Sequence, residues 1–160
     1  GKVVQPANLN SQEQIVIAGH KELVERVSES AKQAGAKKAV LLPVSAPFHC
    51  SLMKPAEIKL HGELEQTEFQ DLNVPVICNV EAKPVSKGID AKQALVRQVC
   101  SPVRWLETMQ YMVDQGIEAV VEIGSGKVLS GLMRRFDKSV DCYQVGDQES
   151  LDKTVAALKR

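Results

Sequence analysis

The chain has 160 residues, of which 44% are hydrophobic and 25% charged, and this composition suits one ordinary domain with a packed core. Its 20 Lys and Arg residues balance its 20 Asp and Glu residues, so no overall field would attract nucleic acid. The longest apolar runs, such as residues 39–44, are far shorter than the roughly 20 residues of a membrane span, and the N-terminus lacks the features of a signal peptide. We therefore expect a cytoplasmic globular protein that contacts neither nucleic acid nor membrane, unless an upstream segment is missing.

The first 46 residues have the pattern strand, strand, helix, strand. Residues 2–10 and 14–20 are β-rich and separated by a polar turn, and apolar residues then recur at helical spacing until Gly35 ends the helix. Residues 37–45 are predicted to form a third strand. Such a small α+β unit usually has a further strand and helix on its N-terminal side, so we expect a segment to precede Gly1.

From residue 47 onward, helices alternate with short apolar strands, which is typical of a mostly parallel sheet covered by helices. The predicted strands are residues 74–80, 117–123 and 140–145. The predicted helices cover residues 53–64, 90–99, 106–113 and 128–136, with a last one around residues 151–158. Pro55 is tolerable in a first turn, Asp90 is a candidate N-cap, and Gly116 is a candidate C-cap.

The turn "EIGSGKVLSGL", residues 122–132, places glycines and a lysine between a strand and a helix. It is not a Walker phosphate loop, because Val121 stands where that loop needs a glycine and Val128 where it needs a hydroxyl. Ser125 is not in a G-x-S-x-G elbow, and neither is any other serine of the chain. A tight structural turn, or amides that hold a carboxylate or phosphate, remain as interpretations.

The stretch "LLPVSAPFHCSLM", residues 41–53, presents a histidine at the end of the predicted third strand. His49 could be a general base, a metal ligand or a packed side chain. Pro43 and Pro47 restrict the backbone around it, and loops at strand ends often carry functional sites. A dyad with Cys50 is not favoured, because neighbouring side chains in an extended segment point to opposite sides. Cys50 is therefore predicted to be a small buried residue.

The chain offers few other candidate sites. Its four cysteines, widely spaced and without a C-x-x-C pair, favour neither zinc nor a disulfide scaffold, so we predict no bound metal. Asn8 and Asn10 alternate along a strand end, where they could orient a substrate or simply favour a turn. Arg134, Arg135 and Lys138 form a basic cluster on one helix face, which is usually just a solvated surface.

Four segments, "VQPANLNSQEQIVIAGH", "LPVSAPFHCSLMKPA", "LVRQVCSPVRW" and "EIGSGKVLSGL", together resemble the second half of a bacterial malonyl-CoA:acyl carrier protein transacylase. The resemblance covers almost the whole chain, in the same order and with similar spacing. It implies an α/β fold. Residues 1–46 would be part of an inserted ferredoxin-like subdomain, and residues 47–160 the C-terminal part of an α/β-hydrolase-like parallel-sheet domain.

The resemblance also implies a function in fatty acid biosynthesis. Malonyl would pass from coenzyme A to a serine and then to the phosphopantetheine thiol of acyl carrier protein, with no bound cofactor. His49 matches the catalytic base, and the main-chain carbonyl of Gln98 matches the group that holds its imidazole. Asn10 matches an active-site asparagine, with Asn8 nearby. Because the family's carrier protein is usually acidic, the basic cluster becomes a candidate contact for it.

One departure from the family is large. The nucleophilic serine, the arginine that pairs with the malonyl carboxylate and the glutamine near the oxyanion hole would all lie upstream of Gly1. This chain alone is therefore predicted to be inactive, with the missing N-terminal part of the enzyme as its partner. Two alternatives remain, namely a non-catalytic ferredoxin-like binding module and a cysteine hydrolase built on Cys50.

Overall fold

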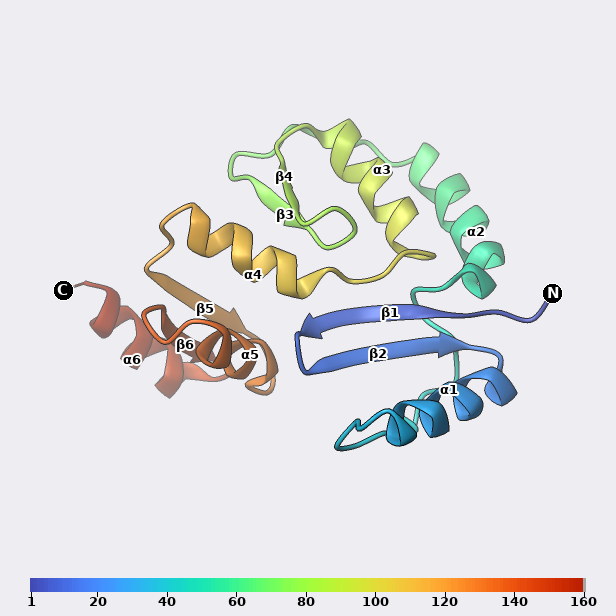
Figure 1. Ribbon diagram of the computed structural model, residues 1–160. Helices are drawn as coiled ribbons and strands as arrows, with labels where there is room; N and C mark the ends of the chain where they lie inside the picture. Colours follow the sequence, from blue (N-terminus) through green and yellow to red (C-terminus); the bar gives the residue numbers. More distant parts are fainter. Residues whose placement is uncertain (160) are drawn as a thin grey trace. The chain divides into compact units, whose positions relative to one another are not determined.

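A computed structural model describes residues 1–159 and shows mixed α/β content with three small sheets, each of two strands. The chain divides into two compact units, residues 1–106 and residues 107–160, and each is described here by itself (Figure 1). The expected α/β content is confirmed. The predicted boundary at residue 46 and the assignment of its two sides to ferredoxin-like and hydrolase-like folds stay predictions.

The first unit begins with an antiparallel hairpin of β1 (Val4–Ser11) and β2 (Gln14–Gly19). Its register shifts twice, between Pro6 and Asn8 and between Leu9 and Ser11, so β1 has two extra residues relative to β2. At the end of β2, a Cβ on Gly19 would lie 2.3 Å from the Val3 carbonyl oxygen. Only glycine permits this close approach, which brings the two ends of the hairpin together.

Helix α1 (Lys21–Gln33) follows the hairpin and contacts β2 (Figure 1). It ends as the sequence predicted, with Gly35 in a left-handed conformation at φ +98°. The Gly35 N–H donates to the Lys32 carbonyl (3.0 Å) and the Ala36 N–H to the Ala31 carbonyl (2.9 Å). This pair of bonds satisfies carbonyls that the helix itself leaves free.

The prediction of a third strand over residues 37–45 is wrong. The segment is irregular, and its apolar side chains are between 53% and 61% exposed, namely Leu42, Leu41, Val44 and Val40. A strand needs a neighbour for its backbone N–H and C=O groups, and no strand within residues 1–159 pairs with this segment. Its β-forming composition is therefore not sufficient to form a strand here.

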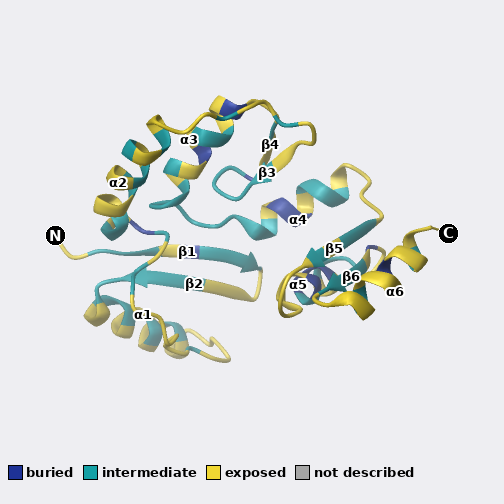
Figure 2. Ribbon diagram, turned by 180° about the vertical axis from the view of Figure 1, so that it is seen from behind, coloured by how far each residue is buried: buried dark blue, intermediate teal, exposed yellow. Residues whose placement is uncertain are grey.

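The rest of the first unit places two helices side by side, α2 (Lys54–Glu65) and α3 (Gly88–Gln98), as both ribbon views show (Figures 1 and 2). A short 3₁₀ helix, η1 (Ser51–Met53), leads into α2, and Pro55 lies in the first turn as expected. The predicted N-cap of α3 is wrong. Asp90 is the third residue of that helix, where a negative charge is favourable, and Asp71 instead accepts from the Gly88 N–H (3.1 Å).

Along the chain between α2 and α3, β3 (Val76–Cys78) pairs antiparallel with β4 (Lys83–Val85). The second strand was not predicted, because Pro84 cannot donate to a ladder and lowers the strand signal of this segment. The expectation of a mostly parallel sheet after residue 47 therefore fails for this hairpin. It holds for the pair β5 (Ala119–Ile123) and β6 (Asp141–Val145), which is parallel.

The second unit contains that parallel pair together with three helices, and its first helix starts at the end of the first unit. These helices are α4 (Trp105–Asp114), α5 (Val128–Phe136) and α6 (Gln148–Leu158). Gly116 ends α4 in a left-handed conformation, with Ile117 N–H donating to the Met112 carbonyl (3.1 Å), which confirms the predicted C-cap. Asp147 and Ser150 form a capping box at the start of α6.

Few large side chains are fully buried in the described chain (Figure 2). The buried apolar residues are Ala7, Cys50, Ala82 and Ala94 in the first unit and Met109, Leu132, Met133 and Val140 in the second. Many larger apolar side chains stay exposed, such as Ile123 at 81% and Val74 at 72%. Within residues 1–159, no helix is both long and apolar enough to cross a bilayer, and no cluster of three potential metal ligands is found.

Candidate functional site

His49 lies in the loop between α1 and η1 and has a left-handed backbone conformation, with φ +62°. Non-glycine residues adopt this conformation rarely, and it persists only where surrounding contacts hold it. The side chain is half-buried, and its Nδ1 lies 3.1 Å from the main-chain carbonyl oxygen of Gln98. The structure therefore brings together the two residues that the resemblance assigned to the general base and its support.

Gln98 is the last residue of α3, so its carbonyl has no partner within the helix. That carbonyl accepts from the Ser101 N–H (3.3 Å) as well as facing His49. The Gln98 side chain is tied locally, because its Nε2 donates to the Ser101 carbonyl (2.8 Å). The turn of residues 98–101 is thus closed from both sides, and it holds the carbonyl oxygen toward the imidazole.

This contact determines what the imidazole of His49 can do. A carbonyl oxygen can only accept, so Nδ1 must carry a hydrogen to bond with it. In a neutral ring, Nε2 then has the lone pair and can accept a proton from a reacting group. The arrangement is one that an oriented general base requires, with the carbonyl in the place that a carboxylate occupies in many catalytic triads. The role itself remains a prediction.

Cys50 does not form a reactive pair with His49. Its side chain is fully buried and its thiol donates to the Pro47 carbonyl (3.2 Å), as expected for a small packed residue. Burial, together with a hydrogen bond to Glu57, raises the pKa of the nearby Cys100 thiol to about 11. Neither thiol is in the exposed, thiolate-stabilising setting of a nucleophilic cysteine, which argues against a cysteine hydrolase.

Asn8 and Asn10 lie on β1, in the same unit as His49 and Gln98. The backbone on either side of Asn8 pairs with Val103. The Leu9 N–H donates to the Val103 carbonyl, and the Val103 N–H donates to the Ala7 carbonyl, both at 2.8 Å. These bonds connect β1 to the segment that follows the Gln98 turn. Asn10 lies at the second register shift, so simple alternation does not describe this strand end.

One contact near His49 has no counterpart in the sequence analysis. The Ser51 N–H donates to Oε1 of Gln5 (2.8 Å), which lies 46 positions earlier on β1. Nothing in the local sequence around either residue indicates this bond, because it depends on how the hairpin and the loop come together. Gln5 is therefore a residue of the site that sequence reasoning missed.

The glycine turn before α5 is structural. The two oxygens of the Glu122 carboxylate accept from the backbone N–H groups of Leu129 (3.1 Å) and Ser130 (2.8 Å). Burial alone would raise the pKa of this carboxyl, but these hydrogen bonds outweigh it and hold the pKa below its usual range. The backbone amides in the first turn of α5 therefore already bind a carboxylate of the protein itself, that of Glu122.

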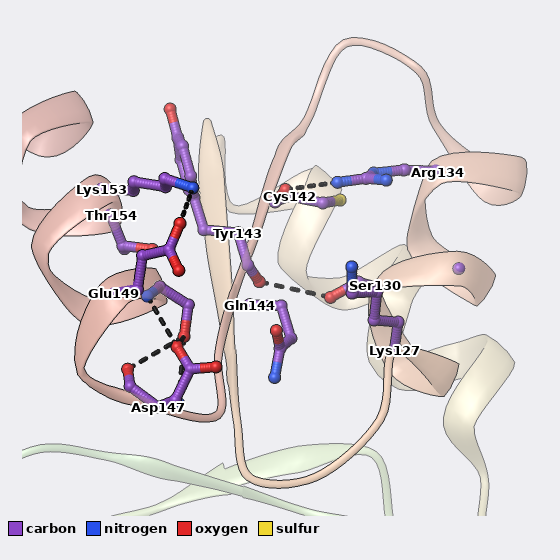
Figure 3. Close-up of a pocket in the computed structure, with 12 residues that line it drawn as sticks. Lys127, Ser130, Arg134, Cys142, Tyr143, Gln144, Asp147, Glu149, Lys153 and Thr154 are labelled. Carbon is purple, nitrogen blue, oxygen red and sulfur yellow. Dashed lines mark hydrogen bonds and ion pairs between the residues drawn. The ribbon is translucent and has the colours of Figure 1, made fainter.

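An open hollow of about 540 Å³ lies in the second unit, between α5, β6 and α6 (Figure 3). Its polar groups contact one another, since Lys153 pairs with Glu149 (2.5 Å) and Arg134 donates to the Cys142 carbonyl (2.7 Å). Arg134 thus already has a hydrogen-bond partner within the protein, whereas Arg135, in the last turn of α5, and Lys138, just after the helix, are exposed. His49 and Gln98 are not among the residues that line this hollow.

No protein-family model matches the chain. The malonyl CoA-acyl carrier protein transacylase of Escherichia coli (strain K12) is 52% identical over 136 residues, which are 85% of this chain and 44% of that protein. The structure of the malonyl CoA-acyl carrier protein transacylase from Coxiella burnetii has a TM-score of 0.95 at 39% identity, over 100% of this chain and 51% of that chain. A malonyl-transacylase solved in complex with a type II PKS acyl-carrier protein has a TM-score of 0.94 at 44% identity, over 98% of this chain and 50% of its own. The chain thus spans about half the length of the curated relatives it matches.

Proposed function

The chain belongs to the malonyl CoA-acyl carrier protein transacylase family and spans about half the length of its relatives. On this basis, we propose that it provides the general base of an acyltransferase active site. The reaction moves malonyl from coenzyme A to the phosphopantetheine thiol of acyl carrier protein, through an acyl-serine, in cytoplasmic fatty acid biosynthesis. The observation that carries this proposal is the 3.1 Å contact between His49 Nδ1 and the Gln98 carbonyl oxygen.

His49 acts in both half-reactions. Its Nε2 takes the proton of the serine hydroxyl while the serine oxygen attacks the malonyl thioester carbon, and it returns that proton to the departing coenzyme A thiolate. In the second half-reaction, Nε2 takes the proton of the phosphopantetheine thiol while the sulfur attacks the acyl-serine carbonyl carbon, and it returns that proton to the serine oxygen as the acyl–oxygen bond breaks. The Gln98 carbonyl accepts from Nδ1–H throughout and stabilises the imidazolium that forms in between.

The nucleophile belongs to the other half of the enzyme in this proposal. No serine of this chain lies in a G-x-S-x-G frame, so the serine, the carboxylate-binding arginine and the oxyanion-hole glutamine come from residues outside it. The exposed apolar segment of residues 40–44 supports this assignment. The segment has the composition of a strand but no strand partner. We expect the other half of an inserted ferredoxin-like subdomain to cover it.

Asn10 and Asn8 are proposed to contact the substrate from β1. Support comes from the bonds that join the backbone beside Asn8 to Val103, which place this strand next to the segment that follows Gln98. An amide offers both a donor and an acceptor, which suits the carbonyl and amide groups of an acyl-pantetheine thioester. The chemistry requires no cofactor, because coenzyme A enters as the thioester substrate.

Arg135, in the last turn of α5, and Lys138, two residues after this helix ends, are proposed contacts for the carrier protein. A relative of similar fold has been solved with its acyl-carrier protein, and an acidic partner would be attracted to this basic face. Replacing both residues by Glu should raise the KM for the carrier and leave kcat unchanged. The same reversal at Lys59, exposed on α2, is the matched control. An unchanged KM in the double variant would remove this surface from the proposal.

The test of the base uses His49→Ala in an enzyme that contains this chain together with its remaining half. We expect malonyl transfer from malonyl-CoA to acyl carrier protein to fall about 10²–10⁴-fold, the usual contribution of a positioned general base. His61→Ala is the matched control, because His61 is exposed on α2 and should be replaceable without effect. Circular dichroism and thermal unfolding should be unchanged in both variants.

Two outcomes would contradict the proposal. Near-full transfer by a folded His49→Ala enzyme would remove the histidine from the chemistry and favour a non-catalytic binding module. Substantial transfer by the purified 160-residue chain alone would show that the nucleophile lies within it. Intact-mass measurement of that preparation must exclude traces of a longer enzyme.

A further inference from the structure

The loop that carries His49 is held at three points. The imidazole faces the Gln98 carbonyl, and the Cys50 thiol donates to the Pro47 carbonyl within the loop. The third contact comes from a distant strand, where Gln5 Oε1 accepts from the Ser51 N–H (2.8 Å). The first fixes the side chain of His49 and the second is local to the loop. Of the three, only the third connects the backbone, two residues beyond His49, to the β1–β2 sheet.

The Ser51 N–H needs a partner from outside its own helix. Ser51 is the first residue of η1, and the first N–H groups of a helix have no intrahelical acceptor. Cys50 occupies the N-cap position but makes no side-chain cap bond, since a thiol is a poor acceptor and this one donates to Pro47. Gln5 therefore does the work of an N-cap from 46 positions away.

The position of Gln5 makes it a firm anchor. It lies in register opposite Ala18 in the β1–β2 hairpin, before the first of the two register shifts. Gln5 is half-buried, which limits the conformations open to its side chain, while Ser51 at the other end of the bond is exposed. A carboxamide held on a paired strand can thus restrict the backbone two residues beyond His49, whose left-handed φ of +62° needs such restraint.

We propose that Gln5 is a positioning residue for the base: through Ser51 it holds the loop in the conformation that keeps the His49 imidazole on the Gln98 carbonyl. This inference rests on the proposed function of His49. Gln5 touches no reacting atom, so its loss should lower kcat while the KM for malonyl-CoA stays the same. One neutral hydrogen bond of this kind corresponds to about a 3- to 10-fold decrease.

The test compares two replacements of equal length. Gln5→Met removes the acceptor oxygen and keeps the size of the side chain, whereas Gln5→Glu keeps an acceptor oxygen in the same place. In the 160-residue chain we expect hydrogen exchange of the Ser51 amide to become about 5- to 10-fold faster in Gln5→Met and to stay slow in Gln5→Glu. The three-bond HN–Hα coupling of His49 should change only in the first variant.

The same two variants are then measured as parts of the active enzyme. Gln5→Met should lower kcat about 3- to 10-fold and Gln5→Glu should restore it, with Gln14→Met, an exposed β2 residue, as control. Equal effects of Met and Glu, an unchanged Ser51 exchange rate or an unchanged kcat in Gln5→Met would each overturn the positioning role. Failure of the proposed function is recognised separately, because His49→Ala would then also retain full turnover.

Discussion

The Nδ1 atom of His49 lies 3.1 Å from the main-chain carbonyl oxygen of Gln98, 49 positions later in the chain. A main-chain acceptor has a different consequence from a carboxylate side chain. It cannot be removed by substituting its own residue, and it adds no negative charge beside the imidazole. The distinction between the carbonyl and the side chain of Gln98 can be tested directly.

Gln98→Ala should leave most of the activity in place. The substitution keeps the carbonyl that faces His49, and it removes the bond from Nε2 to the Ser101 carbonyl together with the long 3.5 Å contact between Nε2 and His49 Nδ1. We expect turnover to fall less than about 10-fold, because one neutral hydrogen bond is worth about 1 kcal/mol. Steady-state malonyl transfer checks this, with Gln93→Ala on the exposed face of α3 as control. A loss as large as that of a folded His49→Ala enzyme would mean that the carboxamide is the true support.

Replacing Gly88 and Gly62 by Ala should change stability in opposite directions. A Cβ on Gly88 would lie 2.4 Å from the Phe69 carbonyl oxygen, and such overpacking costs roughly 1–3 kcal/mol or more. Gly62, within α2, has nothing within 4 Å of the added carbon. There the better helix propensity of Ala should stabilise by about 0.5–1 kcal/mol. Chemical unfolding of the two variants measures both values, and destabilisation by Gly62→Ala would contradict the geometry described for α2.

Glu122→Gln should destabilise the second unit at neutral pH by up to about 1.5–3 kcal/mol, the range for hydrogen bonds to a charged group. The folded-state pKa of this carboxyl is lowered, so its stabilising contribution is complete above its unfolded pKa of roughly 4.3. The contribution is lost as pH falls through the lower, folded-state pKa.

The measurement for Glu122 is the unfolding free energy of the wild type and the variant from pH 7 downward. The difference between them should be largest near pH 7 and should shrink below about pH 4. Glu118→Gln, at an exposed position just before β5, is the matched control and should have little effect at any pH. A difference that grows as the pH falls would contradict the lowered pKa of Glu122.

The Cys100 thiol should react with iodoacetamide only at high pH. Its pKa, raised by burial and by Glu57 to about 11, leaves little thiolate at pH 8. We therefore expect its alkylation rate, followed by mass-spectrometric peptide mapping, to rise about tenfold per pH unit up to pH 10. An unperturbed cysteine, with a pKa of roughly 8.5, would level off near pH 9. Rapid labelling of Cys100 at pH 7 would contradict the buried setting.

Features that depend on a few neighbouring residues were predicted from the sequence. The apolar spacing of α1, α2, α4 and α5 and the glycine C-caps at Gly35 and Gly116 are of this kind, because a helix and its C-cap are determined within one or two turns. His49 was also found locally, from its place in a proline-bracketed loop. Its contact with Gln98 came from the family resemblance, since no pattern along the chain relates two residues so far apart.

Tertiary structure decided which strands pair and which side chains accept the hydrogen bonds of the helix N-termini. Residues 37–45 have a strand's composition, but no strand of the described chain pairs with them, so they form none. Asp71 rather than Asp90 accepts from the first amide of α3, and Gln5 caps η1 from another element. Sequence by itself therefore determined most of the helices and their glycine caps and marked His49 as a candidate site residue, because these depend on local spacing. The acceptors that hold His49 in place depend on hydrogen bonds between distant segments, which exist only once the chain has folded.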